Sequence, residues 1–396
     1  MNRLEGVAYL NTYRSGLLDN LVPFWLRHGL DEKHGGLLGS LDRDGSLLDT
    51  DKQLWQQGRF GWLMATLYNT VEPKAEWLAA SDSALRFLRD HGFDEDGKMF
   101  YLTTQDGKPL RKRRYVFTEG FCALGHAAYA KAAQDDAAAA LAVKCFDSYL
   151  DYNFTPGKMD SKWITEHRPM QGLGPWMIVI NVAQTLRDCI GHEPAQGWID
   201  RAIETIEKEF MLPEYEAVVE VSAPGGKLID HFDGRTMTPG HAIEAAWFIL
   251  DESRHRGGDA ELTRIGCTIL DWMWKHGWDK QYGGLLYFVD IEGKPVQEYW
   301  HDMKFWWPQA ELIIATLLAW KMTGDAKYQE QHRLAHNYFH TNYPDPEYGE
   351  YYGYLHRDGR ISSHLKGNQF KGPFHIPRMQ WYCMQLLEEM LPTLEQ

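Results

Sequence analysis

The chain has 396 residues, of which 44% are hydrophobic and 13% aromatic, and this composition is that of a globular protein. A formal net charge of −14 argues against a nucleic acid or an anionic membrane as the main partner, but not against a neutral small molecule. The sequence lacks a run of about eighteen apolar residues, a signal-peptide block at the amino terminus, and any CxxC spacing among its five cysteines. We therefore expect a cytoplasmic protein with reduced thiols and no membrane segment.

Six segments of the chain follow one plan and recur about sixty residues apart. Each has a glycine-containing turn between alternating apolar residues, as in "HGGLLGSLDRDG" and "YGGLLYFVDIEG", and then the aromatic-rich start of an apolar stretch. Alternation around such a turn predicts a short β-hairpin. The segments begin at His34, Gly97, Pro156, Tyr215, Tyr282 and Tyr348. The copy at Tyr215 is a variant, and the copy at Pro156 is degenerate.

The stretches between these hairpins carry apolar residues at steps of three and four, which predicts helices. Residues 196–211 and 260–278 are examples. Each copy then contributes one hairpin and two helices. Six helix pairs predict an all-α fold, an (α/α)6 barrel with an inner and an outer ring of helices and short β-hairpins at one end. A superhelical stack of helix pairs is the alternative. No Ser/Pro-rich linker interrupts the chain, so we expect a single domain over 1–396.

Polar and ionisable residues recur where the inner helices begin. A single Glu, Gln or His at such a position is commonly a helix cap or a structural residue. Their recurrence at one level of the barrel favours a functional site. These residues are Gln57, Arg59, Glu119, Asn181, His241, Glu244, Gln309, Glu311, His375 and Arg378.

Two of these residues are histidines: His241 directly follows proline and glycine in "TMTPGHAIEAAWF", and His375 is framed by glycine and prolines in "FKGPFHIPRM". The positive end of a helix dipole disfavours a protonated imidazole, so we expect His241 and His375 to be neutral bases near neutral pH. Glu244 lies one helical turn after His241 and can accept a hydrogen bond from it or from a sugar hydroxyl. Nearby aromatic side chains favour a carbohydrate site, because rings cover the C–H faces of a sugar. They are Trp55, Trp163, Trp176, Trp247, Trp306, Trp307, Phe370 and Phe374.

The motifs "TPGHAIEAAWFIL", "MKFWWPQAEL", "DPEYGEYYGYLHRDG" and "FKGPFHIPR" resemble those of the N-acylglucosamine 2-epimerase family, also known through the renin-binding protein. The resemblance extends over nearly the whole chain. It implies an (α/α)6 barrel that interconverts sugars at C2 without a metal or redox cofactor, and commonly a homodimer. ATP is an allosteric effector of some members.

The resemblance also implies roles for individual residues. The acid/base pair of the family falls on His241 and His375, its arginine on Arg59, and its carboxylates on Glu244 and Glu311. A C2 proton is acidic only in the open-chain aldehyde, so Arg59 would stabilise the enolate oxygen while one histidine removes the proton and the other returns it from the opposite face. We predict further substrate contacts from Glu119, Asn181, Trp306, Gln309 and Arg378.

Two departures from the family pattern leave the substrate open. The acylglucosamine epimerases have a histidine at the position of Gln309. A glutamine at this position is more like the cellobiose epimerases and isomerases. The cellobiose epimerases and isomerases usually have a third histidine on the inner helix of the third repeat. The corresponding segment of this chain, "GPWMIVIN", has no histidine, which is typical of the acylglucosamine branch. An N-acylhexosamine is the leading substrate, and the alternative is an aldose–ketose isomerase or a 2-epimerase acting on mannose, cellobiose or a related sugar. An inverting glycoside hydrolase using Glu244 and Glu311, and a protein that binds without catalysis, are alternatives of other classes.

Three further patterns are weaker signals. His332, His336 and His340 share one helix face at a spacing that could hold a metal, but no carboxylate motif accompanies them. The basic run 111–114 could bind an anion, although a solvent-exposed hairpin strand explains it equally well. The acidic-Gly segment at Asp42 lacks the later ligands of a calcium loop and predicts only a turn.

Overall fold

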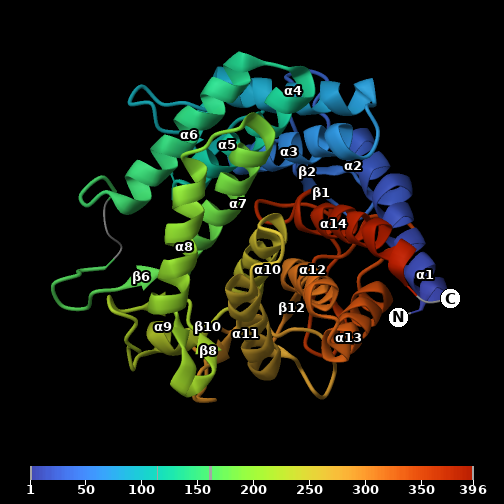
Figure 1. Cartoon of the computed structure of the whole chain (residues 1–396). Coiled ribbons are helices and arrows are strands. Elements are labelled where there is room, and N and C mark those ends of the chain that lie inside the picture. The colour runs from blue at the N-terminus through green and yellow to red at the C-terminus, as the bar shows by residue number, and fades with distance from the viewer. Residues whose placement is uncertain (1, 114, 160–162, 395–396) are drawn as a thin grey trace.

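Six helices form an inner ring in the computed structural model, which describes residues 2–113, 115–159 and 163–394 (Figure 1). They are α3 (Leu54–Thr70), α5 (Phe117–Ala133), α7 (Leu173–Ile190), α10 (Pro239–His255), α12 (Trp306–Thr323) and α14 (His375–Met390). Inner helices are buried on nearly every side, as α12 is from Trp306 to Ala319, because they pack between the outer ring and the centre.

The outer ring surrounds these helices and buries one face of each member. It consists of α4 (Ala75–His91), α6 (Asp136–Phe154), α8 (Ala195–Glu209), α11 (Ala260–Gly277) and α13 (Ala326–Asn342). The sixth position is taken by α1 (Arg3–Ser15), a π-helical turn (Gly16–Leu21) and α2 (Val22–His28), which run on continuously. In α8 the buried residues Ile199, Ile203 and Ile206 follow the three- and four-residue steps that predicted a helix.

The ring is closed by contacts between its first and last inner helices. Trp62 of α3 packs edge-on against Phe374 and Trp381, with ring centroids 5.4 and 5.8 Å apart. The Trp381 indole N–H donates to the hydroxyl of Thr70 at 2.9 Å. At the loop end, the backbone of Leu41 pairs with that of Lys366 and Gly367. This closure confirms the (α/α)6 barrel and rules out the superhelical stack.

Short antiparallel strands lie at the end of the barrel where the inner helices begin. Hairpins are formed by β1 (Ser40–Leu41) with β2 (Leu47–Asp49), β4 (Leu102–Thr103) with β5 (Pro109–Arg111), β7 (Met211–Leu212) with β8 (Ala217–Val218), and β13 (Tyr354–Leu355) with β14 (Ile361–Ser363). The remaining pairs join neighbouring repeats: β3 (Lys52–Gln53) with β4, β6 (Gln171–Gly172) with β9 (Val221–Ser222), β10 (Thr236–Met237) with β11 (Val289–Asp290), and β12 (Lys304–Phe305) with β13. Because β3, β6, β10 and β12 each precede an inner helix, these pairs hold the starts of those helices in register.

Buried polar contacts repeat at the base of the hairpins. The Gln57 amide accepts from the backbone N–H of Leu37 at 2.6 Å and donates to its carbonyl at 2.8 Å. Gln309 makes the same pair of bonds to Leu285, at 2.7 and 2.8 Å, and Glu119 accepts from the N–H of Met99 at 2.9 Å. These bonds satisfy backbone groups that would otherwise be buried without a partner.

Short helical turns complete the chain, at α9 (Phe232–Arg235), Pro213–Tyr215 and Leu391–Thr393. The segment at Asp42 is the predicted turn, closed by the bond from Gly45 N–H to the Asp42 carbonyl. None of the described helices has the length and apolarity needed to cross a bilayer.

Candidate functional site

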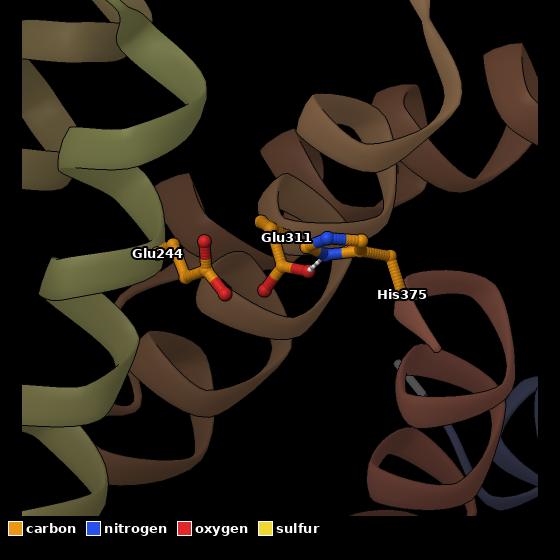
Figure 2. Close-up of side chains that lie close together, drawn as sticks. All are labelled: Glu244, Glu311 and His375. Atoms are coloured by element: carbon orange, nitrogen blue, oxygen red, sulfur yellow. Dashed lines mark hydrogen bonds and ion pairs between the residues drawn. The ribbon is translucent and has the colours of Figure 1, made fainter. Parts of the chain in front are cut away.

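Side chains from three inner helices converge at the centre of the ring. Figure 2 shows Glu244 of α10, Glu311 of α12 and His375 of α14 directed toward one another. The Nδ1 atom of His375 lies 2.7 Å from a carboxylate oxygen of Glu311. The other oxygen of Glu311 accepts a hydrogen bond from the indole of Trp247 at 2.6 Å. The carboxylate is therefore held from two sides and cannot rotate without losing both bonds.

Arg378 joins the two carboxylates. Its guanidinium bonds to Glu311 at 2.8 Å and also to Glu244, and all three side chains are buried. Burial opposes the charge of Arg378, but Glu311 and Glu244 raise its pKa, so it stays cationic. Burial raises the pKa of Glu311, while Arg378 favours its ionised form.

The same cluster has the geometry of a metal site. Ligand atoms of Glu244, Glu311 and His375 lie within 4.8 Å of one another, and no other such group of three occurs among the described residues. Arg378 already bonds to both carboxylates, so the positive charge that two buried carboxylates require comes from the protein. A divalent ion would have to displace this guanidinium, and the donor set therefore fits Arg378 better than a metal.

His375 is a neutral imidazole. Burial lowers its pKa well below the ordinary value, and the nearby charges of Arg378, Arg59 and His241 lower it further against the opposing effect of Glu244. With Nδ1 bonded to Glu311, Nε2 is the nitrogen left for a substrate. The direction of this shift agrees with the neutral base expected at this helix start, with burial as its largest cause, and the catalytic role of His375 stays a prediction.

His241 has the opposite tendency. Its Nδ1 atom lies 3.0 and 3.1 Å from the two carboxylate oxygens of Glu220, a residue between β8 and β9. Burial lowers the pKa of His241, but the charge and hydrogen bond of Glu220 together with the charges of Glu244 and Glu311 outweigh it, and the pKa is raised. This direction is opposite to the one expected from the helix dipole alone, because a carboxylate from the hairpin region that precedes α10 faces the ring. The signal for Glu220 was one acidic residue ending the apolar run Ala217–Val219.

Trp307 brings the two histidines together. Its ring centroid lies 4.8 Å from that of His241 and 5.8 Å from that of His375. Gly240 permits this packing, because a Cβ at that position would lie 2.6 Å from the Trp307 ring. The side chain of His241 is 33% exposed and that of His375 10% exposed, so both are accessible from one region.

Arg59 lies in a cage of aromatic rings. Its guanidinium carbon is 4.1 Å from the ring centroid of Phe121, 4.5 Å from Trp55 and 4.7 Å from Phe374. Burial lowers the pKa of Arg59 to about 9, so it remains charged at neutral pH, and the charges of Glu244 and Glu311 act on it. Its Nε atom is buried without a hydrogen-bond partner among the described residues. Such a cation is suited to a developing oxyanion.

Four predicted substrate contacts lie elsewhere. The amide of Gln309 and one carboxylate oxygen of Glu119 bond to the hairpin backbone, and the other oxygen of Glu119 is buried without a hydrogen-bond partner among the described residues. Trp306 is 2% exposed and packs against Phe305 and Tyr354, whereas its neighbour Trp307 faces the histidines, because successive helix residues point about 100° apart. Asn181 is half-buried on α7 more than two turns from its start, and no hydrogen bond among the described residues joins it to the histidines.

The histidine row on α13 and the described part of the basic run 111–114 both make contacts within the protein. His332, His336 and His340 lie between α13 and α1, where the Tyr13 hydroxyl contacts His332 Nε2 at 3.1 Å and His336 Nδ1 at 2.8 Å. They do not form a metal-ligand group among the described residues. In the basic run, Lys112 pairs with Asp94 and Arg113 with Asp96, each at 3.0 Å, and position 114 lies outside the described residues.

Comparisons with known proteins identify the family of the chain. A family model described as N-acylglucosamine 2-epimerase matches residues 36–376. The N-acylglucosamine 2-epimerase of Bos taurus is 32% identical over 391 residues, covering 95% of this chain and 90% of that protein. A cellobiose 2-epimerase of Bacteroides fragilis is 22% identical over 94% of this chain and 97% of its own length. The structure of cellobiose 2-epimerase from Spirochaeta thermophila matches with a TM-score of 0.85 at 20% identity, over 98% of this chain and 99% of that one.

The centre of the closed (α/α)6 barrel holds an arrangement of two imidazoles, a caged arginine and a buried arginine–carboxylate cluster that is suited to acid–base chemistry. Together with these relatives it defines a carbohydrate 2-epimerase, an enzyme of the isomerase class. The chain belongs to the N-acylglucosamine 2-epimerase family.

Proposed function

We propose that the protein interconverts N-acyl-D-glucosamine and N-acyl-D-mannosamine by moving the proton on C2 of the open-chain sugar. The observation that carries this proposal is the pair of histidines packed on Trp307, each bonded through Nδ1 to a carboxylate. Each ring is thereby oriented, and each keeps Nε2 for the substrate.

The reaction proceeds in two proton transfers. One histidine takes the C2 proton through Nε2, and the electron pair of the C–H bond forms the C1–C2 double bond of an enolate with negative charge on O1. Arg59 stabilises this oxygen, because a buried guanidinium without an ion-pair partner among the described residues gains most from a new anion. The second histidine then donates its proton to the opposite face of C2 and inverts it. General acid–base catalysis of this kind contributes about 10²- to 10⁴-fold per group.

The N-acyl substrate is supported by the greater identity to the bovine N-acylglucosamine epimerase, 32%, than to the cellobiose epimerase of Bacteroides fragilis, 22%. We further propose that residues 1–396 act as one domain in a cytoplasmic homodimer and that the chemistry needs no metal or redox cofactor. The proposal that ATP acts as an allosteric effector rests on the family resemblance alone.

Glycoside hydrolysis fits the site less well. Inverting hydrolases separate their two carboxyl groups by about 6.5–9.5 Å to admit a water. In this site, carboxylate oxygens of Glu244 and Glu311 lie within 4.8 Å of each other, and both residues are bonded to Arg378. Neither carboxylate is free to act as an independent acid or base.

The proposal is tested by incubating the protein with N-acetylglucosamine in D2O and following C1 and C2 by NMR. We expect N-acetylmannosamine carrying deuterium at C2. Mannose and cellobiose are run in parallel as comparison sugars. Rapid ketose formation from mannose with no reaction of N-acetylglucosamine would overturn the proposal in favour of the aldose–ketose isomerase, and conversion of cellobiose alone would favour a disaccharide 2-epimerase.

A further inference from the structure

Glu220 lies on a rigid support beside His241. It directly follows the buried residues Ala217–Val219, its N–H donates to the carbonyl of Thr236, and its carbonyl accepts from the N–H of Leu173. Its backbone is therefore bonded to the segments that begin both α10 and α7. Both carboxylate oxygens lie within hydrogen-bond distance of the same Nδ1 atom of His241. This geometry requires a proton on Nδ1 and so determines which nitrogen of His241 faces a substrate.

The carboxylates beside the two histidines differ in how much of their charge is balanced by a cation. Glu311 bonds to His375 but also to the permanent cation Arg378 at 2.8 Å. Glu220 has no ion-pair partner other than His241 in the described part of the chain. Its negative charge therefore acts on the His241 ring without a second cation to balance it.

The other charged side chains near the two imidazoles also favour a proton on His241 over a proton on His375. Glu220, Glu244 and Glu311 act on His241, and all three favour its protonated form. His375 is affected by two arginines and by His241 itself, which disfavour a second positive charge, as well as by Glu244. A single proton shared between the two imidazoles therefore resides on His241.

We propose that Glu220 is a positioning residue that keeps His241 protonated in the resting enzyme, so that the enzyme starts its cycle with His241 as the acid and His375 as the base. This inference rests on the proposed function, because it assigns roles within the same reaction.

The proton balance of the cycle follows from this assignment. Nε2 of His375 takes the C2 proton of one epimer, and Nε2 of His241 gives its proton to the opposite face of C2. The product leaves an enzyme that is protonated on His375 and neutral on His241, the form that reacts with the other epimer. Solvent then removes the proton from His375 and returns one to His241. Both forms carry one proton on the pair, so kcat/KM for both epimers falls at high pH when that proton is lost.

The test is the substitution Glu220→Gln, which keeps a hydrogen-bond acceptor for Nδ1 but removes the charge. We expect the higher of the two pKa values of the histidine pair, measured by NMR titration of the imidazole nitrogens, to fall by about one unit. The alkaline limit of kcat/KM should move to lower pH by the same amount, with little change in KM at the optimum. Glu214→Gln, an exposed position close by in the chain, is the matched control and should change neither value.

Glu220→Asp keeps the charge, and the alkaline limit of its kcat/KM should return most of the way to the wild-type pH. This variant also provides a test if Glu220→Gln folds poorly. An unchanged titration of His241 in Glu220→Gln, or a raised KM with unchanged pH limits, would overturn the proposal. The NMR titration needs no substrate. If the wild-type protein fails to act on every sugar tested, the proposed function fails, and the titration still decides whether Glu220 controls the proton on His241.

Discussion

The His241 and His375 sides of the site begin from the same local structure but shift the pKa of their histidines in opposite directions. Each histidine lies within the first turn of an inner helix, after glycine and proline, and each bonds through Nδ1 to a carboxylate. On the His375 side, the carboxylate belongs to a cluster containing Arg378. On the His241 side, Glu220 acts without such a cation. The position in the helix therefore orients a histidine, whereas charges contributed by other helices and loops decide whether it starts as an acid or a base.

We expect the largest effect when each histidine is replaced in turn. His241→Asn and His375→Asn should each reduce epimerisation by about 10²- to 10⁴-fold, because one of the two proton transfers is lost. The remaining histidine should still exchange the C2 proton of one epimer with D2O without inversion, and the exchanged epimer should differ between the two variants. The measurement is deuterium uptake at C2, started from each pure epimer.

His356→Asn, at an exposed position, is the control and should behave like the wild type. If either single variant exchanged the C2 proton of both epimers, one histidine would reach both faces of C2. Separate roles for His241 and His375 would then not be needed.

The second test breaks the cluster on the His375 side. Arg378→Met leaves Glu244 and Glu311 buried without their cation, and we expect a loss of about 3–5 kcal/mol in the free energy of unfolding, measured with urea. Arg360→Met removes an exposed ion pair with Asp358 and should cost under about 1 kcal/mol. Equal losses in the two variants would contradict the view that the buried carboxylates depend on Arg378.

A smaller loss of stability should distinguish residues that hold the hairpins from residues that contact the substrate. Gln309→Ala leaves the N–H and C=O of Leu285 unpaired, and we expect a loss of about 1–3 kcal/mol in stability with kcat/KM unchanged in the folded enzyme. Gln57→Ala, the equivalent change in the first repeat, should give the same result. A raised KM without loss of stability in Gln309→Ala alone would restore this residue as a sugar contact.

The smallest effect at neutral pH is that of His332, which bears on stability in acid and not on catalysis. Burial lowers the pKa of His332 to about 4, so the folded protein resists the proton that the unfolded chain accepts near its ordinary pKa of 6.5. Stability is therefore lost as the pH falls from 6.5 to 4, by about 1.4 kcal/mol per pH unit for this one group. His332→Gln should make the stability curve shallower by one proton and leave the alkaline limit of activity unchanged. An unaltered slope between pH 6.5 and 4 would show that His332 is already protonated in the folded state.

Contacts between α3 and α14 close the barrel and exclude a superhelical stack, which the sequence had left open. The sequence alone predicts the repeated hairpin and helix pair and the level at which polar residues gather, because these follow from local periodicity and turn residues. It also indicated His241, Glu244, Glu311, His375, Arg59 and Arg378, which the structure brings together near Trp307. Only the tertiary structure decided that Gln309 and Glu119 bond to hairpin backbones and that Trp307, not Trp306, faces the histidines. It also placed Glu220 beside His241. Charge and hydrogen bonding at a buried site depend on neighbours that lie 20 or more residues away in the chain, which local sequence patterns do not specify.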